Sequence, residues 1–168
     1  MKKVPVLHTA RLNLREITEK DTCAIVTLRS DPNVYKYFVL PHQITDKEHL
    51  TWYKDNYLFD DNKIDWIASD HANNLVGVFG VKRETKDSKE AEVSYILSPK
   101  QYGKGYAAEA VNRLIQFCLE EWRCVYVTAV VHEANSDSIR FAEKLGFEVK
   151  RKRGSFIFYK KKCMQLVF

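Results

Sequence analysis

The sequence predicts a single α/β (α+β) domain over residues 1–168, with a mixed central sheet of about seven strands and helices on both faces. Three observations lead to this fold class. Short apolar, β-branched runs follow one another as hairpins through the middle of the chain. A strand, a helix and a strand come next, which predicts a parallel pair with a right-handed crossover. The length of 168 residues suits one domain with its own core.

Helix-capping signals divide the first half of the chain. Thr18 to Asp21 and Thr45 to Glu48 both have the spacing of a capping box, which starts a helix. Asp31 and Pro32 end the first of these helices, because a residue before proline disfavours the helical conformation. The expected elements are a strand at Leu12–Ile17, helices to about Arg29 and about Tyr57, and hairpin strands at Ile64–Ser69 and Leu75–Lys82.

A long amphipathic helix and its flanking strands occupy the second half. The run Val125 to Val131 is almost continuously apolar, as expected for a strand that is buried on both faces. Asn135 begins a later helix and Gly146 stands at its C′ position. The expected elements are strands at Ala91–Leu97 and Val125–Val131, helices at Gly105–Glu121 and Asn135–Leu145, and a final hairpin of Phe147–Lys152 and Ser155–Val167.

Composition excludes several classes of protein. No apolar run approaches the roughly 18–20 residues of a membrane span, and the basic start lacks a signal-peptide core. We therefore expect a cytoplasmic protein with no membrane partner. The four cysteines form no CxxC pair and the five histidines no HExxH spacing, so we expect buried or half-buried free thiols and no metal. Much of the net charge of +5 lies in the last two strand-like runs, which we interpret as a lysine-protected sheet edge and not as a nucleic-acid surface.

The most informative motif is Gln101 to Ala110, which joins an expected strand to an expected helix. Its glycines leave backbone N–H groups bare, and a helix start adds roughly half a positive charge, so the motif suits a pyrophosphate. A P-loop needs GxxxxGK[ST], which is not present here. A Rossmann fingerprint matches Gly103 to Ala108 literally. Against it, Ser98 to Tyr102 separate the strand from the first glycine, whereas the fingerprint follows its strand directly.

A third interpretation rests on resemblance. The strand, the Ser-Pro step, Gln101 to Ala110 and the helix resemble the acetyl-CoA signature of the GNAT N-acetyltransferase superfamily. Asn135 to Phe147, an Asn-x-x-Ser helix that ends in Lys-Leu-Gly-Phe, is similar to the second signature of that superfamily. Thr9 to Arg15 looks like the start of its ribosomal-protein-alanine (Rim-type) branch. The resemblance implies a GNAT-like fold with two splayed parallel central strands, and an acetyl-CoA-dependent N-acetyltransferase.

The resemblance also implies where acetyl-CoA is held, with CoA as the product. The cofactor is expected between the strands Ala91–Leu97 and Val125–Val131, with its pantetheine arm on backbone groups near Ile96 to Ser98. Its pyrophosphate is expected on N–H groups from Tyr102 to Ala107, where Lys104 either adds a charge or is simply solvated. The implied cofactor-binding residues are Ile96, Leu97, Ser98, Tyr102, Gly103, Lys104, Gly105, Tyr106, Ala107, Asn135, Ser138 and Phe141.

Catalysis requires a neutral amine, and an alkyl amine with a pKa near 10 must lose a proton at pH 7. Glu92 is the expected base, because strand alternation puts it on one face with Ser94; an exposed strand-end carboxylate is the alternative. Transfer is implied to be direct, through a tetrahedral intermediate. Ser138 is expected beside the departing thiolate. Ala142 stands where many members have a tyrosine acid, which leaves Ser138 or water for that role. Glu109 is expected to be a dipole or packing partner.

The acceptor is expected to be a primary amine. The Rim-type resemblance favours a protein N-terminal α-amine. A small amine (an amino sugar nucleotide, a polyamine or an aminoglycoside) is the alternative, and a non-catalytic acetyl-CoA-binding protein also stays open. Specificity is expected from Asp31 to Tyr57 and from Arg153 to Tyr159, which are both rich in aromatic residues. The protein is expected to act as a monomer or homodimer, without nucleic acid.

Overall fold

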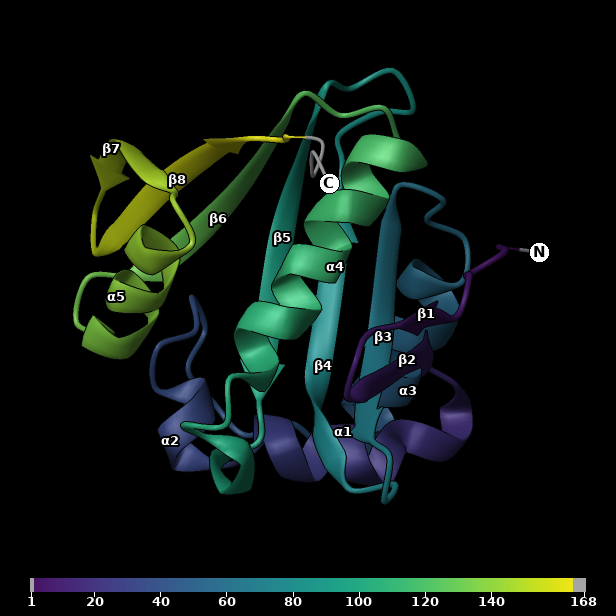
Figure 1. The fold of residues 1–168 in the computed structure, drawn as a ribbon. Coiled ribbons are helices and arrows are strands. Elements are labelled where there is room, and N and C mark those ends of the chain that lie inside the picture. The colour runs from purple at the N-terminus through teal and green to yellow at the C-terminus, as the bar shows by residue number, and fades with distance from the viewer. Residues whose placement is uncertain (1, 165–168) are drawn as a thin grey trace.

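One eight-stranded sheet runs through residues 2–164, the part of the chain that the computed structural model describes (Figure 1). The strand order is β1-β2-β3-β4-β5-β6-β8-β7, and β5 and β6 form its parallel pair among antiparallel neighbours. The sheet is therefore mixed, as the sequence predicts. Its strands are β1 (Leu7–His8), β2 (Leu12–Glu16), β3 (Lys63–Asp70), β4 (Leu75–Lys82), β5 (Glu90–Leu97), β6 (Tyr126–His132), β7 (Glu148–Arg153) and β8 (Phe156–Lys162).

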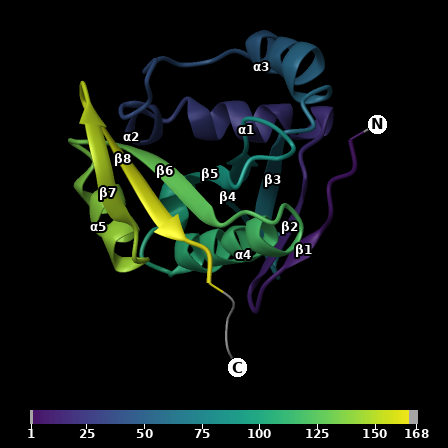
Figure 2. The ribbon, with the colours of Figure 1, turned by 90° about the horizontal axis from the view of Figure 1, so that it is seen from above.

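Helices cover both faces of the sheet, which confirms the expected layers. The helices α4 and α5 lie on one face, and α1, α2 and α3 lie on the other (Figures 1 and 2). The α4 face holds the larger apolar core, with Trp66, Phe79 and Leu114 fully buried. The opposite face holds a smaller cluster around Tyr53 and Tyr57. The helices are α1 (Thr22–Arg29), α2 (Pro32–Tyr35), α3 (Asp46–Trp52), α4 (Tyr106–Glu120) and α5 (Ser136–Lys144).

The parallel strands β5 and β6 pair only briefly before they separate. Glu90 to Glu92 lie opposite Tyr126 to Thr128, and α4 connects the two strands. Farther along, β5 stays with β4 as far as Leu97, while β6 follows β8 to His132. The widening gap between β5 and β6 in Figure 1 is therefore bordered by two strand edges that do not pair with each other. This is the splayed pair that the resemblance implies.

Both predicted capping boxes are present, and the helices differ from expectation near them. Thr18 to Asp21 caps a 3-10 turn (Glu19–Asp21) that leads into α1, whereas Thr45 to Glu48 opens α3 directly. After α3 the chain continues in a π-helical turn, Tyr53–Tyr57. Pro32 ends α1 as predicted but also starts α2, because Asp31 accepts a hydrogen bond from the Asn33 backbone N–H and proline fits the first helical position.

Four other details differ from expectation. Strand β1 was not predicted, because two residues are too few to show a period. Strand β6 alternates, with Val127, Ala129 and Val131 buried and their neighbours half-buried, so only one of its faces is packed into the core. Cys23 is exposed on α1, while the other three cysteines are buried free thiols. The last predicted strand ends at Lys162, and residues 165–168 lie outside the described part of the chain.

The basic hairpin forms the edge of the sheet that the sequence predicts. All six residues of β7, including Lys150 to Arg153, are exposed, and β7 is the last strand of the sheet. Charged side chains on an edge strand oppose pairing with another chain. Within residues 2–164, no helix is both long enough and apolar enough to span a bilayer.

Candidate functional site

The glycine loop ends at the first turn of α4. Gly103 and Gly105 have φ angles of +76° and +78°, a backbone region that side chains rarely adopt, and Gly105 is the N-cap of the helix. A Cβ atom at Gly103 would meet nothing within 4 Å, so the loop presents bare backbone. The first N–H groups of an α-helix have no partner within the helix, and the helix dipole makes this end positive. The loop is therefore chemically suited to a pyrophosphate.

A side-chain network ties the N-terminal segment to this loop. Glu109 accepts hydrogen bonds from the Thr9 hydroxyl and from the Arg11 backbone N–H at 2.8 Å. The Arg11 guanidinium forms an ion pair with Glu109 at 2.7 Å and donates to the Lys104 carbonyl at 2.9 Å. Arg11 also lies 4.6 Å from the centroid of the Tyr106 ring. Glu109 is therefore a partner residue, as predicted, and its partners are Thr9 and Arg11. Arg11 is a residue of this site that sequence reasoning missed.

The charge of Glu109 depends on these contacts. Desolvation alone would raise the pKa of its carboxyl, but the hydrogen bonds from Thr9 and Arg11 outweigh that effect and hold the pKa below its ordinary value. Glu109 thus stays ionised near neutral pH and holds the Arg11 guanidinium against the glycine loop. A cavity of about 300 Å³ opens beside this network, lined by Ala10, Arg11, Asp70, His71, Ala72 and Tyr106.

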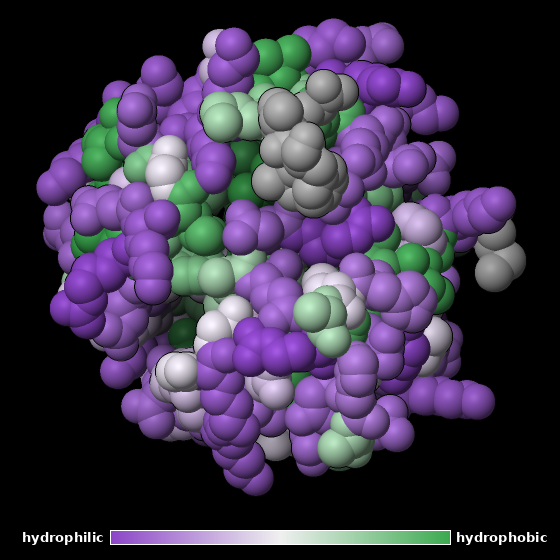
Figure 3. Space-filling view, viewed as in Figure 1, coloured by the Kyte–Doolittle hydropathy of each residue, from purple (hydrophilic) through white to green (hydrophobic). Residues whose placement is uncertain are grey.

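The free edge of β5 continues from the glycine loop. The N–H of Ser98 donates to the Val76 carbonyl at 2.8 Å, so this residue faces β4. Because successive residues of a strand direct their N–H and C=O groups to opposite edges, Val93, Tyr95 and Leu97 face the gap. Of the residues that the resemblance implies for the pantetheine arm, Leu97 offers free backbone groups, while Ser98 has its N–H in use. Figure 3 shows apolar side chains gathered on this face over the gap between α4 and α5.

Glu92 and Ser94 lie on the sheet face that α1 and α3 cover. They stand opposite Lys82 and Gly80 of β4, as the strand alternation predicts. Glu92 is an exposed residue, yet the protein around its carboxyl removes enough water to raise its pKa, and the positive charges of Lys82 and Lys63 oppose the rise only in part. A carboxylate with a raised pKa is a better proton acceptor than an ordinary one.

A second carboxylate lies next to Ser94. A Cβ atom at Gly80 would be 2.1 Å from Asp65 Oδ1 and 2.9 Å from Ser94 Oγ, so the Asp65 carboxylate occupies the space that glycine leaves. Asp65 is only 7% exposed, and burial raises its pKa, although Lys63 lies 3.5 Å away and opposes the shift. Sequence reasoning missed Asp65, because the β3 strand gives no sign that its carboxylate reaches toward β5.

Helix α5 brings the second predicted group of residues to the gap from the other face. The Asn135 side chain accepts a hydrogen bond from the Ser138 N–H at 3.1 Å, which confirms its capping role. The Phe141 ring meets the Tyr95 ring edge to face, with centroids 4.9 Å apart. Position 142 is an alanine that is buried in the core, and it therefore offers no side-chain hydroxyl.

Tyr95 is the residue that sequence reasoning missed on this face. Its hydroxyl is buried and has no hydrogen-bond partner among residues 2–164. Burial raises the pKa of this phenol, and an interaction with the Ser138 side chain opposes part of the rise. Strand alternation directs the Tyr95 side chain to the sheet face opposite that of Glu92. This alternation is the sequence signal that could have identified Tyr95.

The two segments expected to set specificity meet at the far end of β6. The Tyr37 ring lies 5.7 Å from His132, and the Phe156 ring of β8 lies 5.2 Å from the same histidine. Many of the other aromatic residues belong to the core, including Tyr53, Tyr57 and Tyr159.

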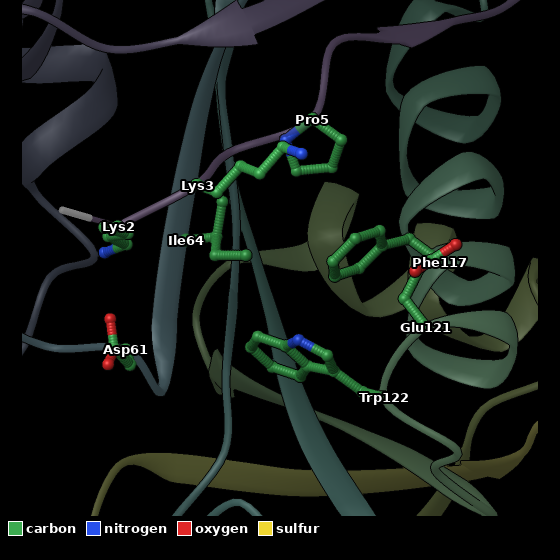
Figure 4. Close-up of a pocket in the computed structure, with 8 residues that line it drawn as sticks. All are labelled: Lys2, Lys3, Pro5, Asp61, Ile64, Phe117, Glu121 and Trp122. Carbon is green, nitrogen blue, oxygen red and sulfur yellow. The ribbon is translucent and has the colours of Figure 1, made fainter.

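A larger cavity of about 410 Å³ lies elsewhere, between the N-terminal segment, β3 and the C-terminal end of α4 (Figure 4). Because the glycine loop is at the opposite end of α4, this cavity does not belong to the site. Its lining residues are Lys2, Lys3, Pro5, Asp61, Ile64, Phe117, Glu121 and Trp122.

A glycine loop at a helix start, beside two separating parallel strands, is the geometry of a protein that binds a pyrophosphate-bearing cofactor. The family model for the acetyltransferase (GNAT) domain matches residues 11–148, and the chain therefore belongs to the GNAT acetyltransferase family. This confirms the predicted superfamily, its N-acetyltransferase class and its cofactor, acetyl-CoA.

Relatives and solved structures agree with this assignment. The chain is 26% identical to the uncharacterized N-acetyltransferase YoaA of Bacillus subtilis, over 86% of this chain and 83% of the relative. It is 24% identical to spermidine N(1)-acetyltransferase of Vibrio cholerae, over 82% and 79% of the two chains. The structure of spermidine N-acetyltransferase from Vibrio cholerae with CoA and spermine superposes with a TM-score of 0.81 at 19% identity, covering 90% and 95%. These likenesses support the superfamily, and not the Rim-type branch in particular.

The glycine loop yields the first prediction. We expect Gly105→Val to raise the Kd for CoA on the order of 100-fold, because a branched side chain covers the bare backbone and lies toward the Arg11 guanidinium, which is 3.4 Å from the Cβ position. The matched control is Gly154→Val, since Gly154 also has a positive φ, +56°, but lies in the β7–β8 turn. Both variants should lose about 1–2 kcal/mol of stability from backbone strain. Equal CoA affinity in the two variants, measured by calorimetry, would contradict the phosphate-site assignment.

Proposed function

We propose that this acetyltransferase moves an acetyl group from acetyl-CoA to a primary amine held on the Glu92 face of the sheet. The observation that carries the proposal is that β5 and β6 stop pairing after Glu92 and Thr128 and leave a gap between them. On the α5 face it borders Ser138, Phe141 and Tyr95, and on the other face it borders Glu92 and Ser94. A cofactor and an acceptor approaching from opposite faces therefore meet between the strands.

The residues present fit acetyl-CoA. Backbone N–H groups from Gly103 to Ala107 would hold the pyrophosphate, whereas the Tyr102 N–H already donates to the Pro99 carbonyl. The free edge of β5 at Tyr95 and Leu97 would pair with the amide groups of the pantetheine arm. The exposed Lys104 ammonium donates to Gln101 Oε1 at 2.8 Å, so it stands beside the loop. When bound, the cofactor supplies an acetyl group activated as a thioester. Asn135 would orient the start of α5, and Phe141 would cover the arm.

Glu92 would remove the proton from the ammonium form of the acceptor. Its raised pKa brings the carboxylate closer to the pH at which it works, and its exposure lets the proton leave to solvent. Asp65 lies near Ser94 on the same face, where Lys63 pairs with it at 3.5 Å.

Ser138 and Tyr95 would stabilise the thiolate that leaves. Both hydroxyls border the gap on the α5 face, and the Tyr95 hydroxyl has no partner of its own in the described chain. A buried phenol with a raised pKa remains protonated at neutral pH and is able to donate its proton. Tyr95 thereby compensates for the alanine at position 142.

The second part of the proposal concerns which amine accepts the acetyl group. A small amine is favoured by the similarity to spermidine acetyltransferases of Vibrio cholerae. A protein N-terminal α-amine is the second candidate, supported by the resemblance of Thr9 to Arg15 to the Rim-type branch. The test is thiol release from acetyl-CoA with a panel of amino sugars, their nucleotide conjugates, amino acids, polyamines, aminoglycosides and N-terminal peptides. Stabilisation by CoA without release with any amine would leave a cofactor-binding protein and contradict the proposal.

The base gives a prediction about pH. We expect kcat/KM to rise with pH through the raised pKa of Glu92, since only the ionised carboxylate accepts a proton. In Glu92→Gln, kcat/KM should fall on the order of 100-fold, and its rise with pH should disappear. The control is Glu90→Gln, which changes an exposed carboxylate on the same strand that pairs with Lys160. A wild-type pH profile in Glu92→Gln would show that Glu92 is only a strand-end carboxylate.

The acid gives a second prediction about mechanism. We expect Tyr95→Phe to lower kcat on the order of 10- to 100-fold, with the KM for acetyl-CoA changed less than about twofold. Because Tyr95 and Ser138 act on one thiolate, Tyr95→Phe and Ser138→Ala should not be additive in the double variant. Tyr126→Phe, a half-buried tyrosine of β6 under Lys160, is the control. Full additivity, or a wild-type kcat in Tyr95→Phe, would exclude the shared role.

A further inference from the structure

A glycine in β4 lets a carboxylate of β3 reach a hydroxyl of β5 across the strand between them. Asp65, Gly80 and Ser94 are register partners and form one row across the sheet. A Cβ atom at Gly80 would lie 2.1 Å from Asp65 Oδ1 and 2.9 Å from Ser94 Oγ, so both oxygen atoms adjoin the space that glycine leaves. A side chain at position 80 would collide with the carboxylate and separate the two groups.

The neighbouring rows on the same sheet face are built differently. The row on one side consists of Glu92, Lys82 and Lys63, and the row on the other side is apolar throughout. Of these three rows, the row of Ser94 is therefore the one that joins a hydroxyl on β5 to a carboxylate behind it.

Ser94 stands where the acceptor amine is expected. The pairing of β5 with β6 stops after Glu92, and Ser94 is the next residue of β5 on the same face. Ser94 is exposed, whereas Asp65 is only 7% exposed. A group that enters the gap beside Glu92 thus meets the Ser94 hydroxyl first and the Asp65 carboxylate behind it.

The surroundings of Asp65 suit a carboxylate that receives a proton. Lys63 lies 3.5 Å from it, and the charges of Lys2 and Arg29 also act on it. The Tyr57 hydroxyl bonds to the backbone of Asp65, at 3.1 Å from both its N and its O atom, and leaves the carboxylate to other partners. Burial outweighs the three cations and raises the pKa of Asp65, so a transferred proton is held more firmly than on an ordinary carboxylate.

Acetylation of an ammonium ion requires that its nitrogen lose two protons. The first leaves before the nitrogen attacks, and the proposed function assigns it to Glu92. The second leaves after the bond from nitrogen to the acetyl carbon has formed, while the C–S bond breaks and its electron pair departs with the sulfur. A carboxylate that still carries the first proton does not accept the second, so a second acceptor on the same face has a chemical role.

We propose that the Ser94 hydroxyl takes this second proton from the acceptor nitrogen and passes its own proton to Asp65. Serine is unchanged by the exchange, and the Asp65 carboxylate becomes a neutral acid. It regains its charge when the proton returns through Ser94 to water after the amide has left. The inference rests on the proposed acetyl transfer. Ser94 contacts the acceptor in this scheme, and Asp65 acts through Ser94.

The pH dependence of kcat tests the relay. We expect kcat to rise with pH through the raised pKa of Asp65, because only the ionised carboxylate accepts a proton. Asp65→Asn should lower kcat about 10-fold and abolish this rise, whereas the rise of kcat/KM that Glu92 causes should remain. The control is Asp87→Asn, which changes an exposed carboxylate in the β4–β5 turn. An unchanged pH profile of kcat in Asp65→Asn would overturn the inference.

Variants of the hydroxyl keep the test independent of the buried carboxylate. Ser94→Ala changes an exposed side chain and should lower kcat as much as Asp65→Asn does, while Ser94→Thr should retain most of it. The double variant should be no slower than either single variant, because the two groups act in series. Gly80→Ala keeps both groups but separates them, and it should also lose the rise of kcat with pH. Ser155→Ala, in the exposed β7–β8 turn, is the control. A wild-type kcat in Ser94→Ala would overturn the relay.

Failure of the proposed function has a different signature from failure of this inference. If no amine is acetylated, the acetyl-transfer proposal fails, and the pair is then judged in the protein alone. The side-chain carboxyl of Asp65 is titrated by NMR, with Asp65→Asn to assign its signal. We expect a higher pKa in Ser94→Ala than in the wild type, because the ionised form loses a hydrogen-bond donor. Equal pKa values in the two proteins would overturn the Asp65–Ser94 contact.

Discussion

The separation of β5 and β6 is the constraint on which the rest of the structure depends. Two parallel strands joined by α4 would ordinarily pair along their length, because unpaired backbone groups inside a sheet are costly. Here they part after Glu92 and Thr128, so that β5 retains one free edge. That edge needs a partner, and a cofactor with amide groups along a flexible arm provides one in the manner of an added strand.

Polar groups without partners lie on both sides of this separation. The Tyr95 hydroxyl is on the α5 face, and the nitrogen atoms of Arg29 and His49 are on the α1–α3 face. Folding tends to leave such groups unsatisfied only where something outside the chain will satisfy them. The glycine loop likewise has backbone N–H groups without partners in the described chain. Arg11 and Glu109 hold the loop in position and leave these N–H groups uncovered.

The sequence predicts the parts of this path that depend on local patterns. Gly103 and Gly105 mark a turn that ordinary residues avoid, Asn135 marks a helix start, and the alternation in β5 separates Glu92 from Tyr95. Contacts between distant segments are not local, and neither the Arg11–Glu109 pair nor the Asp65–Ser94 contact leaves a periodic signal. Burial is equally hidden, because His49 reads as an ordinary helix residue until Trp52 and Arg29 are known to enclose it. The resemblance to the GNAT superfamily predicts the cofactor, but it does not identify Arg11, Asp65 or His49.

The acceptor is decided by a part of the chain that fold similarity does not constrain. A structure that superposes at 19% identity shares the sheet and the helix positions, while most side chains on the α1–α3 face are free to differ. A polyamine site requires carboxylates that exceed the neighbouring cations, so that each ammonium of the substrate has a partner. Around Gly80 this chain has one buried carboxylate, Asp65, which Lys63 already pairs at 3.5 Å. The same scaffold and cofactor thereby suit different amines, and the side chains that face the acceptor decide which one is used.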